Sequence, residues 1–292
     1  MGRSGAGKTS MRSLIFANFT ASDTRRLGAT IDVEHSTVQF MGNLSLNIWD
    51  CGGQHKYLDN YLNEQKENIF GNVEVLIFVF DLETTDKDSE YTLYDECLQN
   101  LSLLSPDAKV YCLVHKIDRI TDADQKTSVV EAYRKAILKR SGAFRPQVHG
   151  TSIWDHTLFQ AWSNIVFTLV PNMVTIKSNL ARFCDLTDAA EVVLFERATF
   201  LVVCCVLHGG QDPNLDRYMT ISQSIKQYRN ACTEQATPFR STHIRTRAYS
   251  LFIEPFTKST YILVITADPD VEPAVTKANI EAARSHFAKL AD

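Results

Sequence analysis

A short segment at the start of the chain has the residue types needed to bind phosphate. Residues 2–9 follow the pattern G-x-x-x-x-G-K-[ST], which ends in Lys8 and Thr9. In such a loop the glycines let backbone N–H groups face the β-phosphate of a nucleotide, the lysine adds positive charge and the hydroxyl reaches Mg²⁺. The loop alone does not separate a kinase from an ATPase or a GTPase. The residues expected to bind the phosphates are Ser4, Gly5, Ala6, Gly7, Lys8, Thr9 and Ser10.

Two further segments could complete a site for the terminal phosphate and its metal. Thr30 lies in "LGATID", between the first predicted helix and the next strand, from where its hydroxyl could reach the γ-phosphate and Mg²⁺. In "WDCGGQ", Asp50 could hold the water shell of the metal, the N–H of Gly53 could meet the γ-phosphate, and Gln54 could orient an attacking water. Taken singly, Thr30 and Gln54 are compatible with ordinary loop residues, so the prediction depends on all the segments together.

A segment that ends a strongly apolar run is predicted to recognise the base of the nucleotide. The segment "LVHKID" contains His115, Lys116 and Asp118. A carboxylate at this position accepts hydrogen bonds from both N1–H and the exocyclic amine of guanine, which adenine cannot donate. Asp118 is therefore predicted to select guanine, and Lys116 to pack its aliphatic stem along the base. In "GTSIWD", the backbone N–H of Ile153 is expected to meet the guanine O6.

The order of these segments is typical of one edge of a parallel sheet. The intervals from Lys8 to Asp50 and from Asp50 to Asp118 are each long enough for one excursion of the chain across a sheet. Doubly wound α/β sheets bind their ligands beyond the carboxyl ends of the strands, which is where every segment falls. The sequence therefore predicts a doubly wound α/β domain that binds a nucleotide.

Hydrophobic periodicity indicates the elements that would position these residues. Met11, Leu14, Ile15 and Phe19 recur at helical spacing, so a helix is expected from Thr9 with its N-terminus toward the phosphate. Strands are expected at 33–40, 43–50, 73–81, 108–116 and 146–152, with Met41-Gly42 as the turn between the first two, and helices at 88–104 and 158–169.

Beyond Pro171 the pattern changes to that of a second, α+β domain. We therefore expect two domains, at residues 1–172 and 173–292. A hairpin of two strands is expected over 191–206, with Glu196-Arg197 between its halves. Further strands are expected at 248–256 and 259–267. Helices are expected at 214–230 and from Pro273 onward.

The composition disfavours nucleic acids and lipids as direct partners. The 292 residues include 30 basic and 34 acidic ones, a net charge of −4, without a block of five like charges. The longest apolar runs, at 75–80 and 198–207, are much shorter than the ~18 residues that span a bilayer. Neither a signal peptide nor a C-terminal lipidation motif is recognisable, and seven irregularly spaced cysteines suit a reducing compartment. We expect a cytoplasmic protein that binds no nucleic acid and does not insert directly into a membrane.

Together, these segments resemble the Rag small GTPases, specifically the RagA/RagB-like subclass. The H-K-x-D form at 115–118, in place of the commoner N-K-x-D, and R-R-L-G-A-T-I-D at 25–32 are much more specific than a generic GTPase motif. The resemblance extends over almost the whole chain and is carried by "GAGKTSMRSLIFANF", "DTRRLGATIDVEHS", "NIWDCGGQ", "NIFGNVEVLIFVFDLE", "SPDAKVYCLVHKID", "TSIWD" and "EVVLFERATFLV".

The resemblance implies a P-loop GTPase domain that binds GTP or GDP with Mg²⁺, followed by a roadblock/longin-like domain that pairs with a RagC/RagD-like subunit. It also implies a membrane-anchored scaffold complex at the lysosome or vacuole, and signalling of amino-acid sufficiency to the TOR kinase complex. A GTPase-activating protein (GAP) is expected because no residue is recognisable as an arginine finger. By motif, Thr9, Thr30 and, through water, Asp50 hold Mg²⁺, Gln54 is the catalytic residue of switch II, and Thr24 also lines the nucleotide.

The chain departs from the family pattern at its start. An apolar strand normally precedes the phosphate loop, and here only Met1 does. Burial of that central strand is comparable with the whole net stability of a domain, so we predict an incomplete start rather than a natural GTPase without its first strand. Two other functions stay open. One is an interaction subunit that binds no nucleotide and acts through its C-terminal domain, and the other is a P-loop kinase, which would leave Asp118 without a function.

Overall fold

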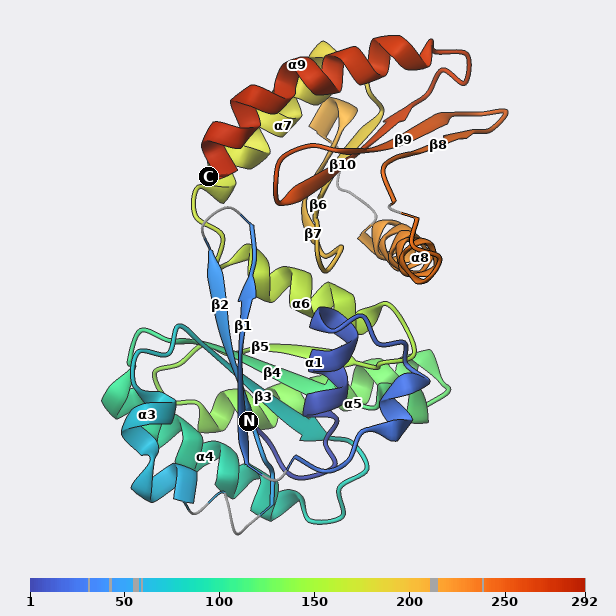
Figure 1. Ribbon diagram of the computed structural model, residues 1–292. Coiled ribbons are helices and arrows are strands. Elements are labelled where there is room, and N and C mark those ends of the chain that lie inside the picture. The colour runs from blue at the N-terminus through green and yellow to red at the C-terminus, as the bar shows by residue number, and fades with distance from the viewer. Residues whose placement is uncertain are drawn as a thin grey trace. The chain divides into compact units, whose positions relative to one another are not determined.

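The structure is a computed structural model that describes residues 1–30, 32–41, 44–54, 58, 60–210, 215–237 and 239–291 (Figure 1). The backbone divides into two compact units. The first comprises Met1–Thr37 and Asn47–Ala161, and the second comprises Val38–Leu46 and Trp162–Asp292. All the predicted site residues belong to the first unit.

A three-stranded parallel sheet with the order β3-β4-β5 lies at the centre of the first unit. Its strands are largely buried, as expected of apolar strands covered by helices. The register pairs Asp81 with His115, and His115 with Thr151, so the last residues of the three strands lie side by side at the carboxyl edge. The strands are β3 (Val75–Asp81), β4 (Lys109–His115) and β5 (Gln147–Thr151).

Two capped helices connect these strands. The carboxylate of Asp86 accepts a hydrogen bond from the Ser89 N–H at the start of α4 (Lys87–Leu104). Helix α5 (Ala123–Arg140) has no counterpart among the predicted elements, because its buried stripe consists of only Tyr133 and Ile137. The other helical elements of this part of the chain are α1 (Lys8–Phe16), η1 (Asp23–Arg26), η2 (Asn60–Glu64), α3 (Lys66–Phe70), η3 (Ile117–Arg119) and α6 (Thr157–Phe167).

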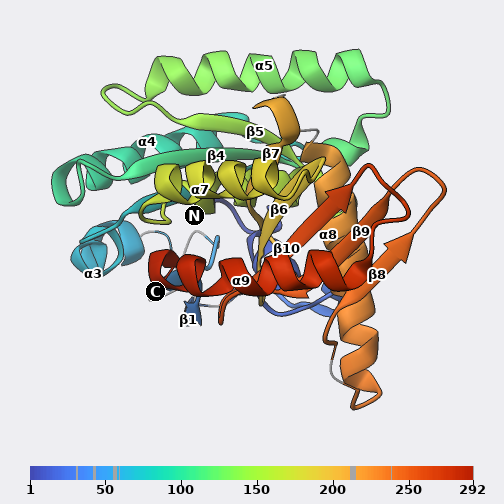
Figure 2. The same cartoon turned by 90° about the horizontal axis from the view of Figure 1, so that it is seen from above.

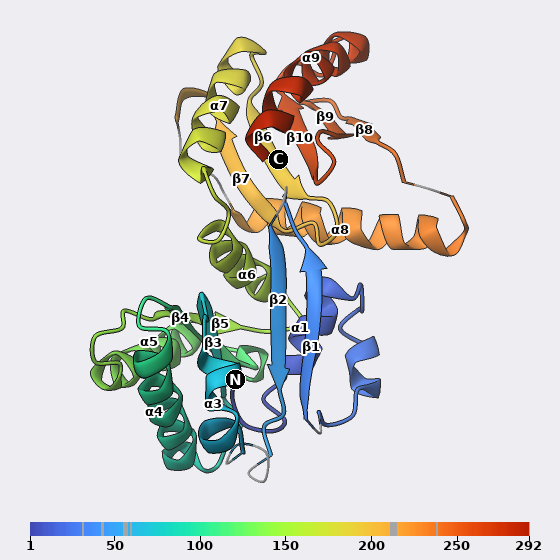
Figure 3. The same ribbon diagram turned by 60° about the vertical axis from the view of Figure 1, so that its left-hand side comes forward.

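Strands β1 (Val33–Gln39) and β2 (Ser45–Cys51) form a separate two-stranded sheet (Figure 3). The predicted doubly wound sheet is therefore divided, because β2 and β3 are not paired in the described part of the chain. Residues 1–4 connect the two sheets instead. The Val79 N–H donates to the Met1 carbonyl (3.0 Å), and the Ser4 N–H donates to the Gly53 carbonyl just after β2 (2.9 Å). Gly42, of the predicted turn, lies outside the described residues.

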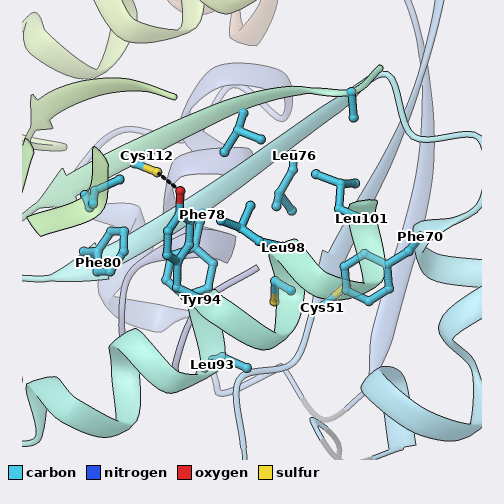
Figure 4. Packing of buried hydrophobic residues seen from close by; sticks show 14 of the residues in the cluster. Cys51, Phe70, Leu76, Phe78, Phe80, Leu93, Tyr94, Leu98, Leu101 and Cys112 are labelled. Carbon is cyan, nitrogen blue, oxygen red and sulfur yellow. Dashed lines mark hydrogen bonds between the residues drawn. The ribbon is translucent and has the colours of Figure 1, made fainter. Parts of the chain in front are cut away.

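The core of the first unit packs β3 against α4. Phe78 and Phe80 are fully buried, with ring centroids 5.1 and 5.4 Å from that of Tyr94 (Figure 4). The buried Tyr94 hydroxyl pairs with Ser141 Oγ at 2.8 Å and accepts a hydrogen bond from Cys112 Sγ at 3.6 Å. Because each aromatic pair adds about 0.5–1.5 kcal/mol to simple burial, this cluster holds β3 and β4 firmly beneath the site.

The second unit is built on a five-stranded antiparallel sheet with the order β7-β6-β10-β9-β8. Helices α7 and α9 lie side by side over one face (Figure 2), and α8 lies on the opposite face (Figures 1 and 3). The elements are α7 (Met173–Leu186), β6 (Glu191–Glu196), β7 (Val202–Leu207), η4 (His208–Gly210), α8 (Leu215–Glu234), β8 (Thr242–Arg245), β9 (Ser250–Pro255), β10 (Thr260–Thr266) and α9 (Pro273–Ala291).

Most of the predicted elements are confirmed. The hairpin predicted over 191–206 corresponds to β6 and β7, although the chain turns at 197–201 rather than at Glu196-Arg197 alone. Strand β8 was not predicted, because its residues are mostly exposed and show no apolar alternation. In the described part of the chain, no helix is both long and apolar enough to cross a membrane.

Candidate nucleotide-binding site

The phosphate loop forms a tight turn directly ahead of α1. Gly2, Gly5 and Gly7 have φ angles of +131°, +80° and +89°, which residues with a side chain rarely adopt. Lys8 begins the helix and folds back over the loop, where its Nζ donates to the carbonyls of Gly2 (2.7 Å) and Arg3 (2.8 Å). Burial lowers the pKa of this lysine. Of the other predicted phosphate ligands, Ser4 and Gly5 are exposed, Ala6 is buried, and Thr9 and Ser10 are half-buried.

The segment that follows β2 lies against this loop. Besides the bond from Ser4 to the Gly53 carbonyl, a β-carbon added to Gly53 would lie 2.2 Å from backbone atoms of Arg3 and Ser4. Only glycine therefore permits this approach. Gln54, the next residue, is exposed in the bend after Gly53. The structure thus brings Gly53 and the phosphate loop together and leaves the Gln54 side chain in solvent.

Thr9, Thr30 and Asp50 supply oxygen atoms of the kind that Mg²⁺ prefers. The hydroxyls of Thr9 and Thr30 lie 2.6 Å apart, so the first turn of α1 touches the segment that leads into β1. Asp50 is 5% exposed, and its Oδ2 lies 3.4 Å from Nε of Arg12 without a hydrogen-bond partner among the described residues. A buried carboxylate oxygen without a hydrogen bond needs a partner, and a water of a hydrated cation could supply it at Asp50.

The base-recognition residues from two separate strands also meet. Ser152 Oγ, just beyond β5, donates to Asp118 Oδ1 at 2.6 Å, and the Trp154 N–H donates to Ser152 Oγ at 3.0 Å. Ile153 lies between them in the chain and is half-buried. The carboxylate of one loop and the backbone N–H groups of the other are thereby held at the same edge of the sheet.

His115 connects the base end of the site with the phosphate loop. Its Nδ1 lies 3.0 Å from Thr151 Oγ1, and a β-carbon on Gly7 would lie 2.9 Å from its Nε2. The imidazole is 2% exposed, and burial together with the adjacent charge of Lys116 lowers its pKa to about 4. At neutral pH the ring is therefore neutral and serves as a hydrogen-bonding and packing link.

Two carboxylates that were not predicted from the sequence hold Lys116. Its Nζ lies 2.7 Å from Asp81 Oδ2 and 3.2 Å from Glu83 Oε2, and the backbone of Lys116 is left-handed, with φ +67°. Asp81 is the last residue of β3 and is itself held by its N–H, which donates to Glu90 Oε1 at 2.8 Å. The signal in the sequence is a carboxylate at the end of a predicted strand, which is also how Asp50 was identified; the strand predicted at 73–81 ends in Asp81.

Thr24 lies apart from the contacts described above. It is 7% exposed in η1, and its hydroxyl donates to the Ala21 carbonyl at 2.7 Å, within the same turn. No hydrogen bond joins its side chain to another predicted site residue in the described part of the chain. Its expected role toward the nucleotide stays a prediction.

With this geometry established, comparison with known proteins identifies the family. The Gtr1/RagA G protein conserved region matches residues 1–225. The chain belongs to the Gtr1/RagA family of G proteins. It is 47% identical over 292 residues to Ras-related GTP-binding protein A of Dictyostelium discoideum (99% of this chain and 96% of that one). It is 47% identical over 286 residues to GTP-binding protein gtr1 of Schizosaccharomyces pombe (97% and 92%), and 42% identical over 318 residues to Ras-related GTP-binding protein B of Rattus norvegicus (99% and 84%).

The predicted resemblance to RagA/RagB-like proteins is therefore confirmed. As a member of the Gtr1/RagA family, the chain is a GTP-binding protein and a GTP hydrolase. The residues present fit a guanine nucleotide. The glycines of the phosphate loop have positive φ angles, β-carbons at Gly2, Gly7 and Gly53 would overlap neighbouring atoms, and Lys8 brings a cation to this loop.

Proposed function

We propose that this Gtr1/RagA-family protein is a molecular switch in which GTP and GDP are distinguished by the segments around Thr30 and Gln54. The observation that carries the proposal is the hydrogen bond of 2.6 Å between Ser152 Oγ and Asp118 Oδ1. It supports guanine recognition because it holds the carboxylate of one loop beside the backbone N–H groups of the other. Asp118 would accept from N1–H and the exocyclic amine, and the Ile153 N–H would donate to O6.

The phosphates would be bound by the loop and by the first turn of α1. Backbone N–H groups at a helix N-terminus carry a partial positive charge, which the Lys8 ammonium reinforces. The Gly53 N–H would donate to the γ-phosphate. Bound Mg²⁺ supplies positive charge that bridges and neutralises the phosphates, and Thr9, Thr30 and, through water, Asp50 would hold it.

Hydrolysis would depend on Gln54 as the residue that orients the attacking water. Its exposure and its position beyond the rigid Gly53 contact support a role that requires movement, since a switch segment has to adopt different positions in the two nucleotide states. Slow hydrolysis without a GAP is expected, because no residue of the sequence is recognisable as an arginine finger.

The second half of the chain would serve dimerisation. We assign residues 1–172 to the GTPase domain and 173–292 to a roadblock/longin-like domain, with the boundary between the end of α6 at Phe167 and the start of α7 at Met173. The five-stranded antiparallel sheet with two helices on one face and one on the other supports this fold. The proposed partner is a RagC/RagD-like subunit. The pair would be recruited by a scaffold complex to the lysosomal or vacuolar membrane and would signal amino-acid sufficiency to the TOR kinase complex.

A competition titration tests the proposal. A fluorescent GTP analogue is expected to bind saturably in the presence of Mg²⁺, to be displaced by GTP and not by ATP, and to bind more weakly when Mg²⁺ is removed by EDTA. In Asp118→Asn, preference should move from guanine toward xanthine nucleotides, because an amide can donate to the oxygen that replaces the exocyclic amine. Equal competition by ATP would remove the guanine assignment. A complete lack of binding would instead favour an interaction subunit that acts through its C-terminal domain.

A further inference from the structure

An arginine and a tryptophan from two of the segments quoted in the sequence analysis meet at the surface of the first unit, and neither side chain has been given a role above. The guanidinium carbon of Arg25 lies 5.3 Å from the ring centroid of Trp154. Arg25 is exposed and Trp154 is 50% exposed, so the pair lies at the surface of the first unit. Arginine over tryptophan is the most favourable cation–π pairing, and the distance is within the ~6 Å over which it acts.

The two residues belong to separate loops, one that leads to Thr30 and one that carries Ser152 and Ile153. Arg25 follows Thr24 in η1, a turn held by the Asp23 carboxylate, which accepts from the Thr20 N–H (2.8 Å) and hydroxyl (2.6 Å). The same segment continues to Thr30. The Arg25 side chain therefore extends from a structured turn rather than from an irregular loop.

Trp154 is anchored to the base end of the site. It follows Ile153, and its N–H donates to Ser152 Oγ, which in turn donates to Asp118. A shift of the Trp154 backbone would therefore disturb the groups proposed to bind guanine. The Arg25–Trp154 contact joins this loop to the segment that carries Thr30.

We propose that Arg25 and Trp154 form a latch that slows the release of bound guanine nucleotide. This inference rests on the proposed nucleotide site. In this proposal the nucleotide lies between the two loops, so its release requires them to separate, and separation breaks the contact between guanidinium and indole. Neither side chain acts on the reacting atoms, so both are positioning residues.

The test measures dissociation of mant-GDP from the full-length protein after addition of excess unlabelled GDP. Arg25→Ala and Trp154→Ala are each expected to accelerate release about two- to fivefold, the range for an exposed cation–π pair. The double variant should release no faster than the faster single variant, because both substitutions remove the same contact. Arg25→Lys and Trp154→Phe, which keep a cation or a ring, should lie between the alanine variants and the unaltered protein.

Arg26→Ala is the matched control, since it removes the same charge from the same turn of η1. Release at the unaltered rate is expected for this variant. The latch is overturned if Arg25→Ala and Trp154→Ala release mant-GDP at the unaltered rate, if Arg26→Ala accelerates release equally, or if the two effects multiply in the double variant. Saturable mant-GDP binding by the unaltered protein, displaced by GTP and not by ATP, tests the site itself. If that binding fails, the proposed function and the latch both fail, whereas binding with unchanged release rates removes only the latch.

Discussion

The imidazole of His115 packs so closely on Gly7 that a β-carbon at Gly7 would lie 2.8 Å from its Cδ2 atom. The contact joins the end of β4 to the phosphate loop, although the two residues are far apart in the chain. Gly7 is therefore constrained twice: its backbone is left-handed, with φ +89°, and a β-carbon would overlap the imidazole. The H-K-x-D histidine and the phosphate loop therefore form one structural unit.

Gly7→Ala should destabilise the protein and weaken nucleotide binding. The left-handed backbone alone costs about 1–2 kcal/mol for a residue with a β-carbon, and the overlap with His115 adds to that cost. The free energy of unfolding from urea titration measures the loss. Gly142→Ala is the control, because Gly142 has φ +56° and open space around the added carbon. An equal loss in the two variants would show that the His115 contact contributes nothing.

His115 should make stability depend on pH. Burial keeps its pKa in the folded protein at about 4, below the ordinary value of 6.5, so the unfolded chain binds the extra proton first. The free energy of unfolding is therefore expected to fall as the pH drops from 6.5 to 4, by at most about 1.4 kcal/mol per pH unit. His115→Asn removes this contribution, and urea titrations at several pH values should show a flatter profile. The same slope in both proteins would contradict the assignment.

The residues that carry nucleotide chemistry could be predicted because their types and order are restricted by that chemistry. Lys8, Asp50 and Asp118 each lie at or near the end of a predicted strand or helix, and the structure packs the phosphate loop against both Gly53 and His115. The Ser152–Asp118 and His115–Gly7 contacts were not predictable, because a hydroxyl and a glycine have many other uses. The close approach of Gly53 to the backbone of Arg3 and Ser4 could not be predicted either, because a contact between main-chain atoms leaves no pattern of side chains in the sequence.

Other parts of the fold were missed for different physical reasons. Helix α5 buries a stripe too narrow to stand out among its charged residues, and β8 is an exposed edge strand held by backbone bonds to β9. The two sheets of the first unit are joined through main-chain hydrogen bonds of Met1 and Ser4, which no residue pattern predicts.

Asp81→Asn should weaken GTP binding through Lys116. The carboxylate of Asp81 is only 11% exposed and lies 2.7 Å from Lys116 Nζ, so its loss leaves the ammonium without its most buried partner. A hydrogen bond between charged groups contributes about 1.5 kcal/mol or more, which predicts at least about a tenfold rise in the dissociation constant by fluorescence titration. Glu83→Gln is the control. Its side chain is 43% exposed and also binds Arg119, so a change of about threefold at most is expected. Equal effects would refute a special role for Asp81.

Gln54→Leu should slow GTP hydrolysis while it leaves GTP affinity unchanged. The side chain is exposed, so the substitution should disturb little of the fold and the effect should fall on the catalytic step. We expect at least a ~10-fold lower rate in single-turnover assays with the protein in excess. Leucine and glutamine are similar in size, which limits steric effects. A parallel loss of affinity would indicate that Gln54 binds nucleotide rather than orienting water.

Glu90→Gln should stabilise the protein at high pH, opposite in sign to the effect of His115. Glu90 is fully buried, its Oε1 accepts from the Asp81 N–H, and its Oε2 has no hydrogen-bond partner among the described residues. Burial raises its pKa to about 7 from an ordinary 4.5, so the folded protein keeps a proton that the unfolded chain releases. Stability from this group is present below pH 4.5 and is lost as the pH rises toward 7.

The glutamine variant keeps the acceptor for the Asp81 N–H without the charge. Above pH 7 it should exceed the unaltered protein in free energy of unfolding by on the order of 2 kcal/mol, and the gain should vanish near pH 4.5. Urea titrations at both pH values measure the difference, with nucleotide concentration held constant. Glu96→Gln, at an exposed position of the same helix, should change stability little at either pH. A gain for Glu90→Gln that is independent of pH would mean that the carboxyl is not ionised on unfolding in this range, and the explanation from burial would fail.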